Sequence, residues 1–474
     1  MPPQLALALG ILAIGWLFVE GQRFEPKISK ACWLPAIWLF ILGSRGVTAW
    51  PLVQSLGFSA PKESADSYIE GSPFDRIVFL ALIAGGVVVL LRRRLAWQQV
   101  IRENKWLFAF FLYLGISVLW SDYPFVSFKR WTKDLGNVVM VLVVLSDPQP
   151  LAAVRAVLAG CSYALIVLSI VFIKYFPDIG RYFDRSTWEY HFGGVATDKN
   201  MLGWSLFMSA VFLAWNWFHL RKREPRPMRL LLTYPLLLLG ILWLFHAANS
   251  STGLGCSLLA IGILLALKLP AIRFRVPQLG WYLGIIVVFL ALFDAVFGLR
   301  ELIVTGLGRD LTLTGRTDIW ALVLKEKVNP LIGTGFYSFW LGDRSDRLSQ
   351  HFFFRLNEAH DGYLETYLNS GWIGLILLVI FLLAAGKRIK NHLAAGDEYA
   401  DLRLALLISI AFYNVTESAF NRMAPIWFLL LLIVTDYTAG ATAAESAQVE
   451  SGDVATDGVE GAEVESPVEA GSRC

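Results

Sequence analysis

A continuous apolar stretch, GWIGLILLVIFLLAAG at residues 371–386, indicates the kind of fold that this chain adopts. It carries no charged side chain, and similar runs recur along most of the sequence. An α-helix needs about 20 mainly apolar residues to cross roughly 30 Å of hydrocarbon. Strands of a closed membrane barrel would alternate in polarity instead. The runs therefore predict helices near residues 4–19, 31–48, 75–91, 106–120, 134–146, 154–173, 201–219, 230–246, 253–268, 280–298, 371–386, 403–415 and 424–437.

The composition agrees with many membrane-spanning helices. Of the 474 residues, 56% are hydrophobic, 14% aromatic and only 17% charged, and the mean hydropathy is +0.55. A soluble multidomain protein is far less apolar. The four cysteines follow neither a disulfide framework nor a metal-ligand spacing. We expect an all-α polytopic membrane protein with 12 or 13 transmembrane helices, depending on whether every short run crosses. We expect no metal and no cofactor.

Clusters of lysine and arginine mark alternate connections between the predicted spans. They lie near residues 23–30, 92–105, 221–229, 268–275 and 387–403. The positive-inside rule places such clusters on the cytoplasmic side of a membrane. The remaining connections then face the periplasm, near residues 49–74, 121–133, 174–200, 247–252, 299–371 and 416–423.

The chain divides into four parts on this basis. Residues 1–298 hold the first ten predicted spans, residues 299–371 form one large periplasmic loop, and residues 372–438 hold the C-terminal spans. Residues 439–474 are rich in acidic and small residues and cannot bury enough apolar surface to fold. We expect a disordered cytoplasmic tail there, and a candidate active site in the large loop.

The large loop contains the motif GRTDIW at residues 315–320. Thr317 is able to cap a short helix, which would place Arg316 just before that helix and beside a turn at Gly315. A guanidinium at the edge of a polar cavity is suited to bidentate binding of phosphate. The alternative is an arginine that snorkels to the bilayer surface.

A second motif of the large loop is HDGYLE at residues 360–365. A helix beginning near Asn357 would carry one aromatic face and a neighbouring acidic stripe, and Gly371 would end it or mark entry into the next span. The face would hold His360, Tyr363, Leu364 and Tyr367, and the stripe Asp361 and Glu365. A single imidazole amid aromatic side chains is suited to act as a general base for a sugar hydroxyl. The alternative is an interfacial histidine in an aromatic belt.

Basic residues also occur in the smaller outer segments. They are Arg130, which lies in a cluster that runs against the positive-inside trend, Arg181, Arg185, and Lys199 with its neighbour Asn200. Such charge suggests an anionic ligand, although isolated basic residues also serve as interfacial anchors. The outer loops contain no Asp-x-Asp pair, no His/Cys ligand set and no Gly-x-Ser-x-Gly elbow. An enzyme here would neutralise a leaving anion with arginine and lysine.

Several motifs, taken in order, resemble the O-antigen ligase and polymerase superfamily. They are Gly315-Arg316 with Trp320, NPLIGTG at residues 329–335, and His360 followed by Tyr363-Leu364 and the glycines that lead into a span. The segments WSD at 120–122, KRW at 129–131, KNMLG at 199–203 and TES at 416–418 are similar to its exopolysaccharide-production branch. The resemblance covers residues 30–437 and rests on the ordered combination, because each motif alone is weak.

The resemblance implies a GT-C type glycosyltransferase of the bacterial inner membrane. Such an enzyme transfers a glycan from an undecaprenyl-diphosphate donor to a sugar hydroxyl on the periplasmic side, with inversion and without a metal. Matched motif to motif, His360 corresponds to the base and Arg316 to a diphosphate ligand. Ligases often carry another arginine in a Ser-Arg stretch, where this chain reads NSSTG at residues 249–253. Its possible substitutes are Arg181, Arg185, Lys199, Arg130 and Arg45.

Three functions are compatible with the sequence. The first is a polymerase of lipid-linked repeat units, and the second is a ligase that passes a finished glycan to lipid A core or to a protein. The third is a transporter or flippase of lipid-linked glycans, although the charged residues expected inside its spans are sparse. The implied partners are an undecaprenyl-diphosphate-linked oligosaccharide, a glycan or lipid A core acceptor, membrane lipids, and polysaccharide-export and flippase proteins, with no nucleic acid.

Overall fold

The computed structural model describes residues 1–58, 72–184, 188–273, 275, 278, 316–352 and 356–437. The chain divides into two compact units, Met1–Tyr437 and Thr438–Cys474, and all described residues belong to the first. The predicted span near residues 280–298 and the predicted tail at 439–474 lie outside the described residues. The same holds for Arg185 and Gly315.

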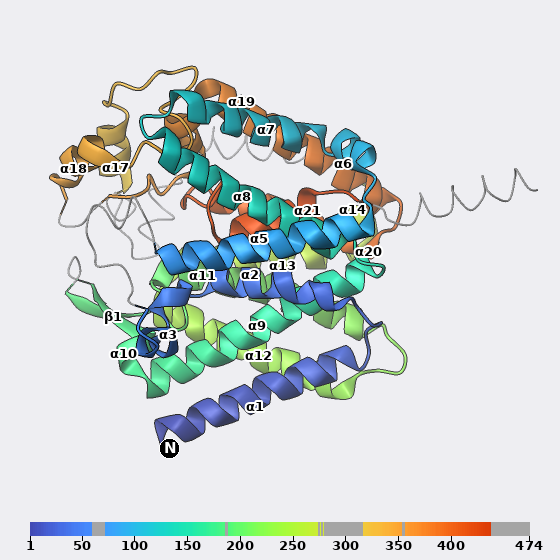
Figure 1. Ribbon diagram of the computed structural model, residues 1–474. Helices are drawn as coiled ribbons and strands as arrows, with labels where there is room; N and C mark the ends of the chain where they lie inside the picture. Colours follow the sequence, from blue (N-terminus) through green and yellow to red (C-terminus); the bar gives the residue numbers. More distant parts are fainter. Residues whose placement is uncertain are drawn as a thin grey trace, which may run out of the picture. The chain divides into compact units, whose positions relative to one another are not determined.

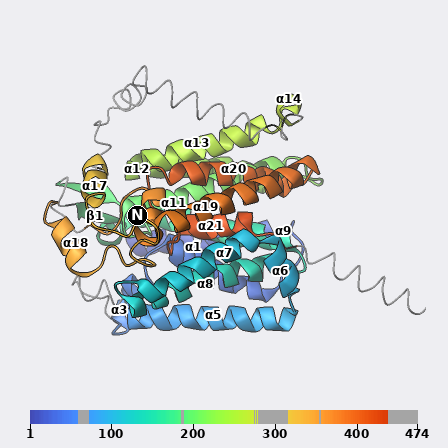
Figure 2. The same cartoon turned by 90° about the horizontal axis from the view of Figure 1, so that it is seen from above.

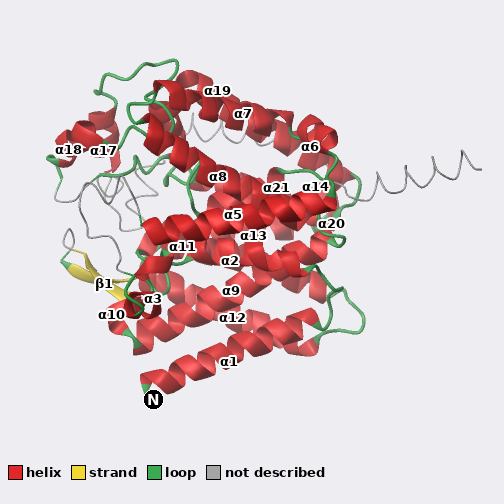
Figure 3. Cartoon of the chain, in the orientation of Figure 1, coloured by secondary structure: helices red, strands yellow, loops and turns green. Residues whose placement is uncertain are grey.

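The first unit is built almost entirely from helices (Figures 1 and 3). Its strands β1 and β2 form one antiparallel hairpin in which Arg181 lies opposite Phe192. The described elements in chain order are α1 (Pro3–Gln22), η1 (Lys30–Cys32), α2 (Trp33–Gly43), η2 (Val47–Ala49), α3 (Pro51–Ser55), α5 (Pro73–Arg93), α6 (Trp97–Glu103), α7 (Lys105–Ile116), η3 (Ser117–Trp120), α8 (Pro124–Leu145), α9 (Pro150–Tyr175), α10 (Pro177–Gly180), β1 (Arg181–Asp184), β2 (Glu189–Phe192), α11 (Lys199–Leu220), α12 (Met228–Ala248), α13 (Ser251–Ala266), α14 (Pro270–Arg273), α17 (Arg316–Val323), α18 (Gly342–Ser349), α19 (Gly362–Ala394), α20 (Glu398–Tyr413) and α21 (Pro425–Val434). The predicted all-α fold is confirmed.

Six helices of the described residues are long and apolar enough to cross a bilayer, namely α1, α5, α9, α11, α12 and α19. Four shorter apolar segments accompany them, at Lys30–Gly43, Lys105–Trp120, Ser251–Ala266 and Pro425–Val434. The two other predicted runs within the described chain fall in α8 and α20. The chain is therefore a multi-pass membrane protein, and each predicted run that the structure describes is helical.

The long helices lie side by side, and their connections gather at two ends (Figures 1 and 2). α3, α10, β1, α17 and α18 lie at one end, which we call the loop end. α6 and α14 lie at the opposite end, which we call the basic end because it carries basic clusters of the sequence. The connections that the charge pattern assigns to two different sides therefore lie at opposite ends of the helices.

α11 and α21 form the centre of this unit. Every residue of α21 is buried, and α11 packs against α9, α12, α13 and α21. The buried residues of α11 cover all of its faces. A helix that is apolar all round is expected in such a central position. The beginnings of both helices reach the loop end, where they help to position the candidate site.

α8 begins at Pro124, before the apolar run that the sequence shows near residues 134–146, so the connection expected at 121–133 is largely helical. Proline is favoured in the first turn of a helix, where its missing N–H would have no partner. Lys129, Arg130 and Lys133 interrupt the apolar pattern of the first turns, which is why a run of apolar residues misses them. These basic residues therefore lie on a rigid helix and not in a loop.

α19 begins at Gly362, so the predicted start near Asn357 is wrong. The Oδ1 atom of Asp361 accepts hydrogen bonds from the backbone N–H groups of Tyr363 (2.8 Å) and Leu364 (2.9 Å), which fixes the first turn. His360 precedes this cap and shares no helical face with Tyr363. Gly371 interrupts α19 at φ 64° and ψ −168°, so the first helical segment of α19 ends at the predicted glycine.

Candidate functional site

A cavity of about 670 Å³ opens near the loop end between segments that are far apart in the sequence. α8 and the first turn of α11 form one part of its wall, the large loop a second part, and the segment before α21 a third. Its lining residues are Arg130, Lys133, Asp134, Tyr182, Asp198, Lys199, Asn200, Met201, Trp204, Phe336, Tyr337, Asn357, Glu358, Asn421, Arg422, Met423 and Ala424. We call it the basic cavity because four of these side chains are cationic.

Separate elements position the cations of the basic cavity. Arg130 donates from Nη1 to the carbonyl oxygen of Tyr337 at 2.8 Å, which ties α8 to the large loop. The Lys133 ammonium lies 4.6 Å from the ring centroid of Phe79. Lys199 is the first residue of α11.

Two acidic side chains of the basic cavity accept hydrogen bonds from the protein, and among the described residues only Oδ2 of Asp134 in this pair is buried without a partner. Asp134 accepts hydrogen bonds from the side chains of Trp427 (2.7 Å) and Asn137 (3.0 Å). Asp198 caps α11, and its Oδ1 atom accepts two backbone N–H groups at 2.9 Å. Among the described residues, by contrast, Lys133 and Lys199 form no ion pair. The cavity therefore offers positive charge to an anion.

A chain of five charged side chains runs beside the basic cavity. Arg316 donates from Nη2 to Glu417 Oε1 at 2.6 Å and from Nη1 to the carbonyl oxygen of Thr416. The Nδ1 atom of His360 lies 3.5 Å from Glu417 Oε2 and 3.5 Å from Glu358 Oε1. Glu358 also pairs with Arg422 through Oε2. We call Arg316, Glu417, His360, Glu358 and Arg422 the charged relay, and its last two members reach the cavity wall.

The backbone holds His360 in a fixed place. Its φ angle is 51°, in the left-handed region that non-glycine residues adopt only in particular contexts. On one side, the Trp320 indole donates to the carbonyl oxygen of Ala359 at 2.8 Å. On the other side, the backbone N–H of Asp361 donates to the Ser418 hydroxyl at 3.0 Å. α17 and the segment before α21 thus clamp the histidine from both sides.

The relay sets the protonation of its members. Burial alone would lower the pKa of His360, yet Glu358 and Glu417 together raise that pKa above its ordinary value. Burial would likewise raise the pKa of the Glu417 carboxyl, but His360 and Arg316 lower it. A carboxylate facing Nδ1 stabilises the imidazolium that forms when the other ring nitrogen takes up a proton. The arrangement is therefore suited to accept a proton from a bound group.

We expect that a Glu358→Gln substitution lowers the pKa of His360, because it removes one of the two carboxylates that raise this pKa. The measurement is a pH titration of the His360 imidazole in the full chain by NMR. An Asp343→Asn variant, which changes an exposed carboxyl of the same loop, serves as the control and should leave the pKa of His360 in place. A pKa of His360 that does not fall in Glu358→Gln would contradict the influence of this contact.

Other residues that the sequence singled out near His360 have structural contacts. Asp361 caps α19, and the Tyr363 hydroxyl donates to the carbonyl oxygen of Ala411 at 2.9 Å. The buried Glu365 carboxylate accepts hydrogen bonds from the Trp340 indole (2.9 Å), the Ala359 backbone N–H (3.0 Å) and the Asn369 amide (2.8 Å). Glu365 therefore joins the large loop to α19 and does not line the basic cavity.

The predicted phosphate ligands lie in different places. Arg130 and Lys199 line the basic cavity, together with the predicted supporting residue Asn200. Arg181 does not, because its guanidinium donates to the carbonyl oxygen of Ile173 at 2.9 and 3.0 Å. Arg45 likewise donates to backbone carbonyls of residues 179 and 194–196.

Arg316 is the first residue of α17, so Thr317 lies inside this helix and not at its cap as predicted. The Arg316 side chain is 15% exposed and is held by Glu417. It does not line the basic cavity. In this structure Arg316 is therefore a member of the charged relay, and its contact with His360 runs through Glu417.

Glu358 was not identified from the sequence. It is an isolated acid two residues before His360, and nothing in its local pattern distinguishes it from a solvated loop residue. Glu417 was noted only within the motif TES at residues 416–418. Its link to His360 depends on contacts across more than fifty residues of chain, such as the one between Asp361 and Ser418.

The fold and the site define a class of protein, a multi-pass helical membrane protein with a cationic cavity and a buried histidine–carboxylate cluster near the loop end. No protein-family model matches the chain. The chain is 27% identical over 349 residues to the exopolysaccharide production protein ExoQ of Rhizobium meliloti (strain 1021). The aligned region covers 71% of this chain and 74% of that protein. This similarity confirms the resemblance to the exopolysaccharide-production branch of the O-antigen ligase and polymerase superfamily.

Proposed function

We propose that this chain is a membrane glycosyltransferase that polymerises glycan from an undecaprenyl-diphosphate-linked donor on the periplasmic face of the inner membrane. The observation that carries the proposal is the basic cavity, which cations from α8, α11 and the segment before α21 line. His360 does not line this cavity, but its Nδ1 atom lies 3.5 Å from the carboxylate of the lining residue Glu358. The similarity to a protein named for exopolysaccharide production supports the same class of product. A diphosphate needs such cations, because charge develops on it as the glycosyl bond breaks.

The proposed step is one inverting displacement. The acceptor hydroxyl oxygen forms a bond to the anomeric carbon, and the bond from that carbon to the diphosphate oxygen breaks. The diphosphate leaves with the electron pair, while His360 takes the hydroxyl proton on Nε2, because Nδ1 faces Glu358 and Glu417. General base catalysis of this kind contributes roughly 10²–10⁴-fold to a rate. No metal ion takes part in this proposal.

The cations divide into two roles in this proposal. Lys199, Lys133 and Arg130 lie on the cavity wall and would bind the diphosphate. Arg316 acts through Glu417, which it orients and keeps ionised, and so is a positioning residue. Direct contact between Arg316 and the diphosphate would require its pair with Glu417 to open.

A Lys199→Gln variant tests the cavity as a diphosphate site. We expect kcat/KM for the lipid-linked donor to fall about 10- to 100-fold, because a charge-assisted contact to phosphate is worth roughly 1.5–3 kcal/mol. The measurement is elongation of a defined lipid-linked oligosaccharide in proteoliposomes. Lys129→Gln is the matched control, because Lys129 lies on α8 near the same end but does not line the cavity. Equal activity of both variants would count against the cavity as the donor site.

A further inference from the structure

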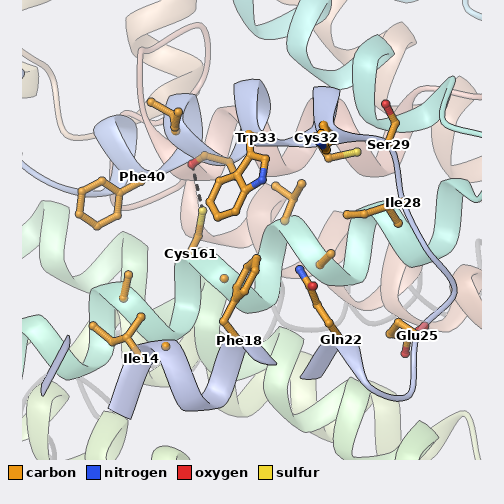
Figure 4. A pocket seen from close by; sticks show the side chains of 18 of the residues that line it. Ile14, Phe18, Gln22, Glu25, Ile28, Ser29, Cys32, Trp33, Phe40 and Cys161 are labelled. Atoms are coloured by element: carbon orange, nitrogen blue, oxygen red, sulfur yellow. Dashed lines mark hydrogen bonds between the residues drawn. The ribbon is translucent and has the colours of Figure 1, made fainter. Parts of the chain in front are cut away.

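An apolar groove lies between α1, α2 and α9 (Figure 4). Its volume is about 730 Å³, within the range of roughly 300–1,000 Å³ that ligand sites usually have. In Figure 4 the side chains of Phe18 and Trp33 approach each other across it, and their ring centroids are 5.2 Å apart. The Cys161 thiol donates to the carbonyl oxygen of Ala36 at 3.3 Å, so this thiol already has a partner within the protein.

The position of the groove determines what kind of molecule fills it. α1 is a candidate membrane span that packs along α9 and α12, and its groove-lining Ile11 is 56% exposed. Trp33 and Ile37 of α2 are 55% and 44% exposed on the facing wall. Within a bilayer, such walls border hydrocarbon, and an ordered water would find few polar partners between them. A hydrocarbon chain is therefore the fitting occupant.

One end of the groove is polar and positive. It is formed by the connection between α1 and α2, which contributes Lys27, Lys30, Gln22 and Glu25 to the lining. Among the described residues, neither lysine forms an ion pair, whereas Glu25 is engaged.

The carboxylate of Glu25 is held by two arginines. It lies 3.0 Å from the Arg223 guanidinium and 3.6 Å from that of Arg155. Two buried nitrogens of Arg155, Nε and Nη2, donate to no group of the described chain. Arg155 borders a small recess that shares Phe18, Gln22 and Glu25 with the groove. The polar end therefore has an excess of positive charge for a negatively charged headgroup.

We infer that this groove binds a membrane phospholipid with an anionic headgroup. Its acyl chain lies along Phe18 and Trp33, and its phosphate lies at Lys27 and Lys30. Basic pockets between membrane helices on the cytoplasmic side are suited to anionic headgroups, and the positive-inside rule places this connection on that side. The polyprenyl donor is a poorer fit, because its diphosphate belongs in the basic cavity, whereas the polar end of the groove lies at the opposite end of α1 from the loop end (Figure 1).

Two variants separate the apolar part from the charged part of this site. Gly15 lines the groove, and a Cβ atom added there would meet no atom within 4 Å, so we expect the side chain in Gly15→Leu to extend into the groove. Gly255 in α13 has equally open surroundings and lines none of the cavities described above, which makes Gly255→Leu the matched control. The double variant Lys27→Gln/Lys30→Gln removes the headgroup charge, and Lys387→Gln/Lys390→Gln is its control at the same end.

The experiment is native mass spectrometry of the full chain in detergent with added phosphatidylglycerol, phosphatidylcholine or undecaprenyl phosphate. We expect the native chain to retain phosphatidylglycerol and Gly15→Leu to lose it. In Lys27→Gln/Lys30→Gln the affinity for phosphatidylglycerol should fall roughly 30-fold, because each basic side chain contributes about fivefold. Both controls should retain the lipid. Equal retention of phosphatidylcholine, preferential retention of undecaprenyl phosphate, or binding unchanged in both test variants would overturn the inference. Thermal unfolding of each purified variant shows whether it is folded. If one test variant is not folded, lipid binding by the other test variant decides whether the inference holds.

Discussion

Replacement of His360 by alanine is expected to abolish polymer formation while the protein still inserts into the membrane. The loss should be about 10²–10⁴-fold in rate, the usual contribution of a general base. Lipid-linked oligosaccharide should accumulate on the outer leaflet, because donor delivery does not depend on this residue. The measurement combines chain-length analysis of the surface glycan with leaflet-specific labelling of the lipid-linked pool in a strain that expresses only the variant.

A second variant separates the chemistry of His360 from its backbone conformation. Asparagine adopts the left-handed region readily, so His360→Asn is compatible with the φ of 51° and replaces the basic imidazole by a neutral amide. We expect the His360→Asn variant to be as inactive as the His360→Ala variant and as stable as the native protein. Unchanged polymer in either variant would contradict the proposed mechanism. Oligosaccharide trapped on the inner leaflet would favour a flippase, and full-length glycan retained on the lipid carrier would favour a ligase.

Substitution of Gly371 by alanine is expected to disrupt the packing of the large loop against α19. The residue has φ 64° and ψ −168°, and a Cβ atom there would lie 2.3 Å from the backbone carbonyl group of Leu331. Immediately after it, the backbone N–H groups of Trp372 and Ile373 donate to the carbonyl oxygens of Pro330 (2.8 Å) and Leu331 (3.1 Å). The contact is between two backbones, so neither partner can rotate away. We expect a destabilisation of about 3 kcal/mol or more.

The measurement is thermal unfolding of the purified variant, together with limited proteolysis of the large loop. Gly255→Ala is the control, because a Cβ atom at Gly255 meets no atom within 4 Å and alanine favours the helix. The control should unfold at or above the native temperature. If Gly371→Ala matched it, the loop would not be held against the membrane-spanning part of α19 in the way described here.

The spans could be predicted from the sequence because burial in hydrocarbon leaves a continuous apolar run, which is a local signal. Helix starts were predicted less well. α8 begins at Pro124 within a basic segment, and its charged residues interrupt the apolar run that would have indicated a helix. α19 begins after a cap formed by Asp361. The second error had the larger consequence, because it placed His360 on a helix when it lies before one. Aspartate is a favoured N-cap residue, and the motif HDGYLE contains one at Asp361, so the sequence did hold a signal for the correct helix start.

The candidate site could be predicted only in its separate parts. Lys199 and Arg130 were singled out as outer cations, and both line the same cavity. The pairing of Arg316 was not predictable, because its partner Glu417 is 101 residues away and reaches it only through the packing of α17 near the segment before α21. Sequence spacing carries no information about such a contact. The surroundings of His360, and hence the direction of its pKa shift, depend on that same packing.

The shared position of Glu358 couples anion binding in the cavity to protonation of His360. Glu358 uses one carboxylate oxygen for Arg422 on the cavity wall and the other for His360. An anion that paired with Arg422 would compete with Glu358 for this arginine, which would leave more of the carboxylate's negative potential for the imidazole and raise the pKa of His360. By thermodynamic reciprocity, a protonated His360 would then tighten the hold on the anion by the same factor. Departure of the anion would in turn lower the pKa of His360 and help the imidazole to release its proton.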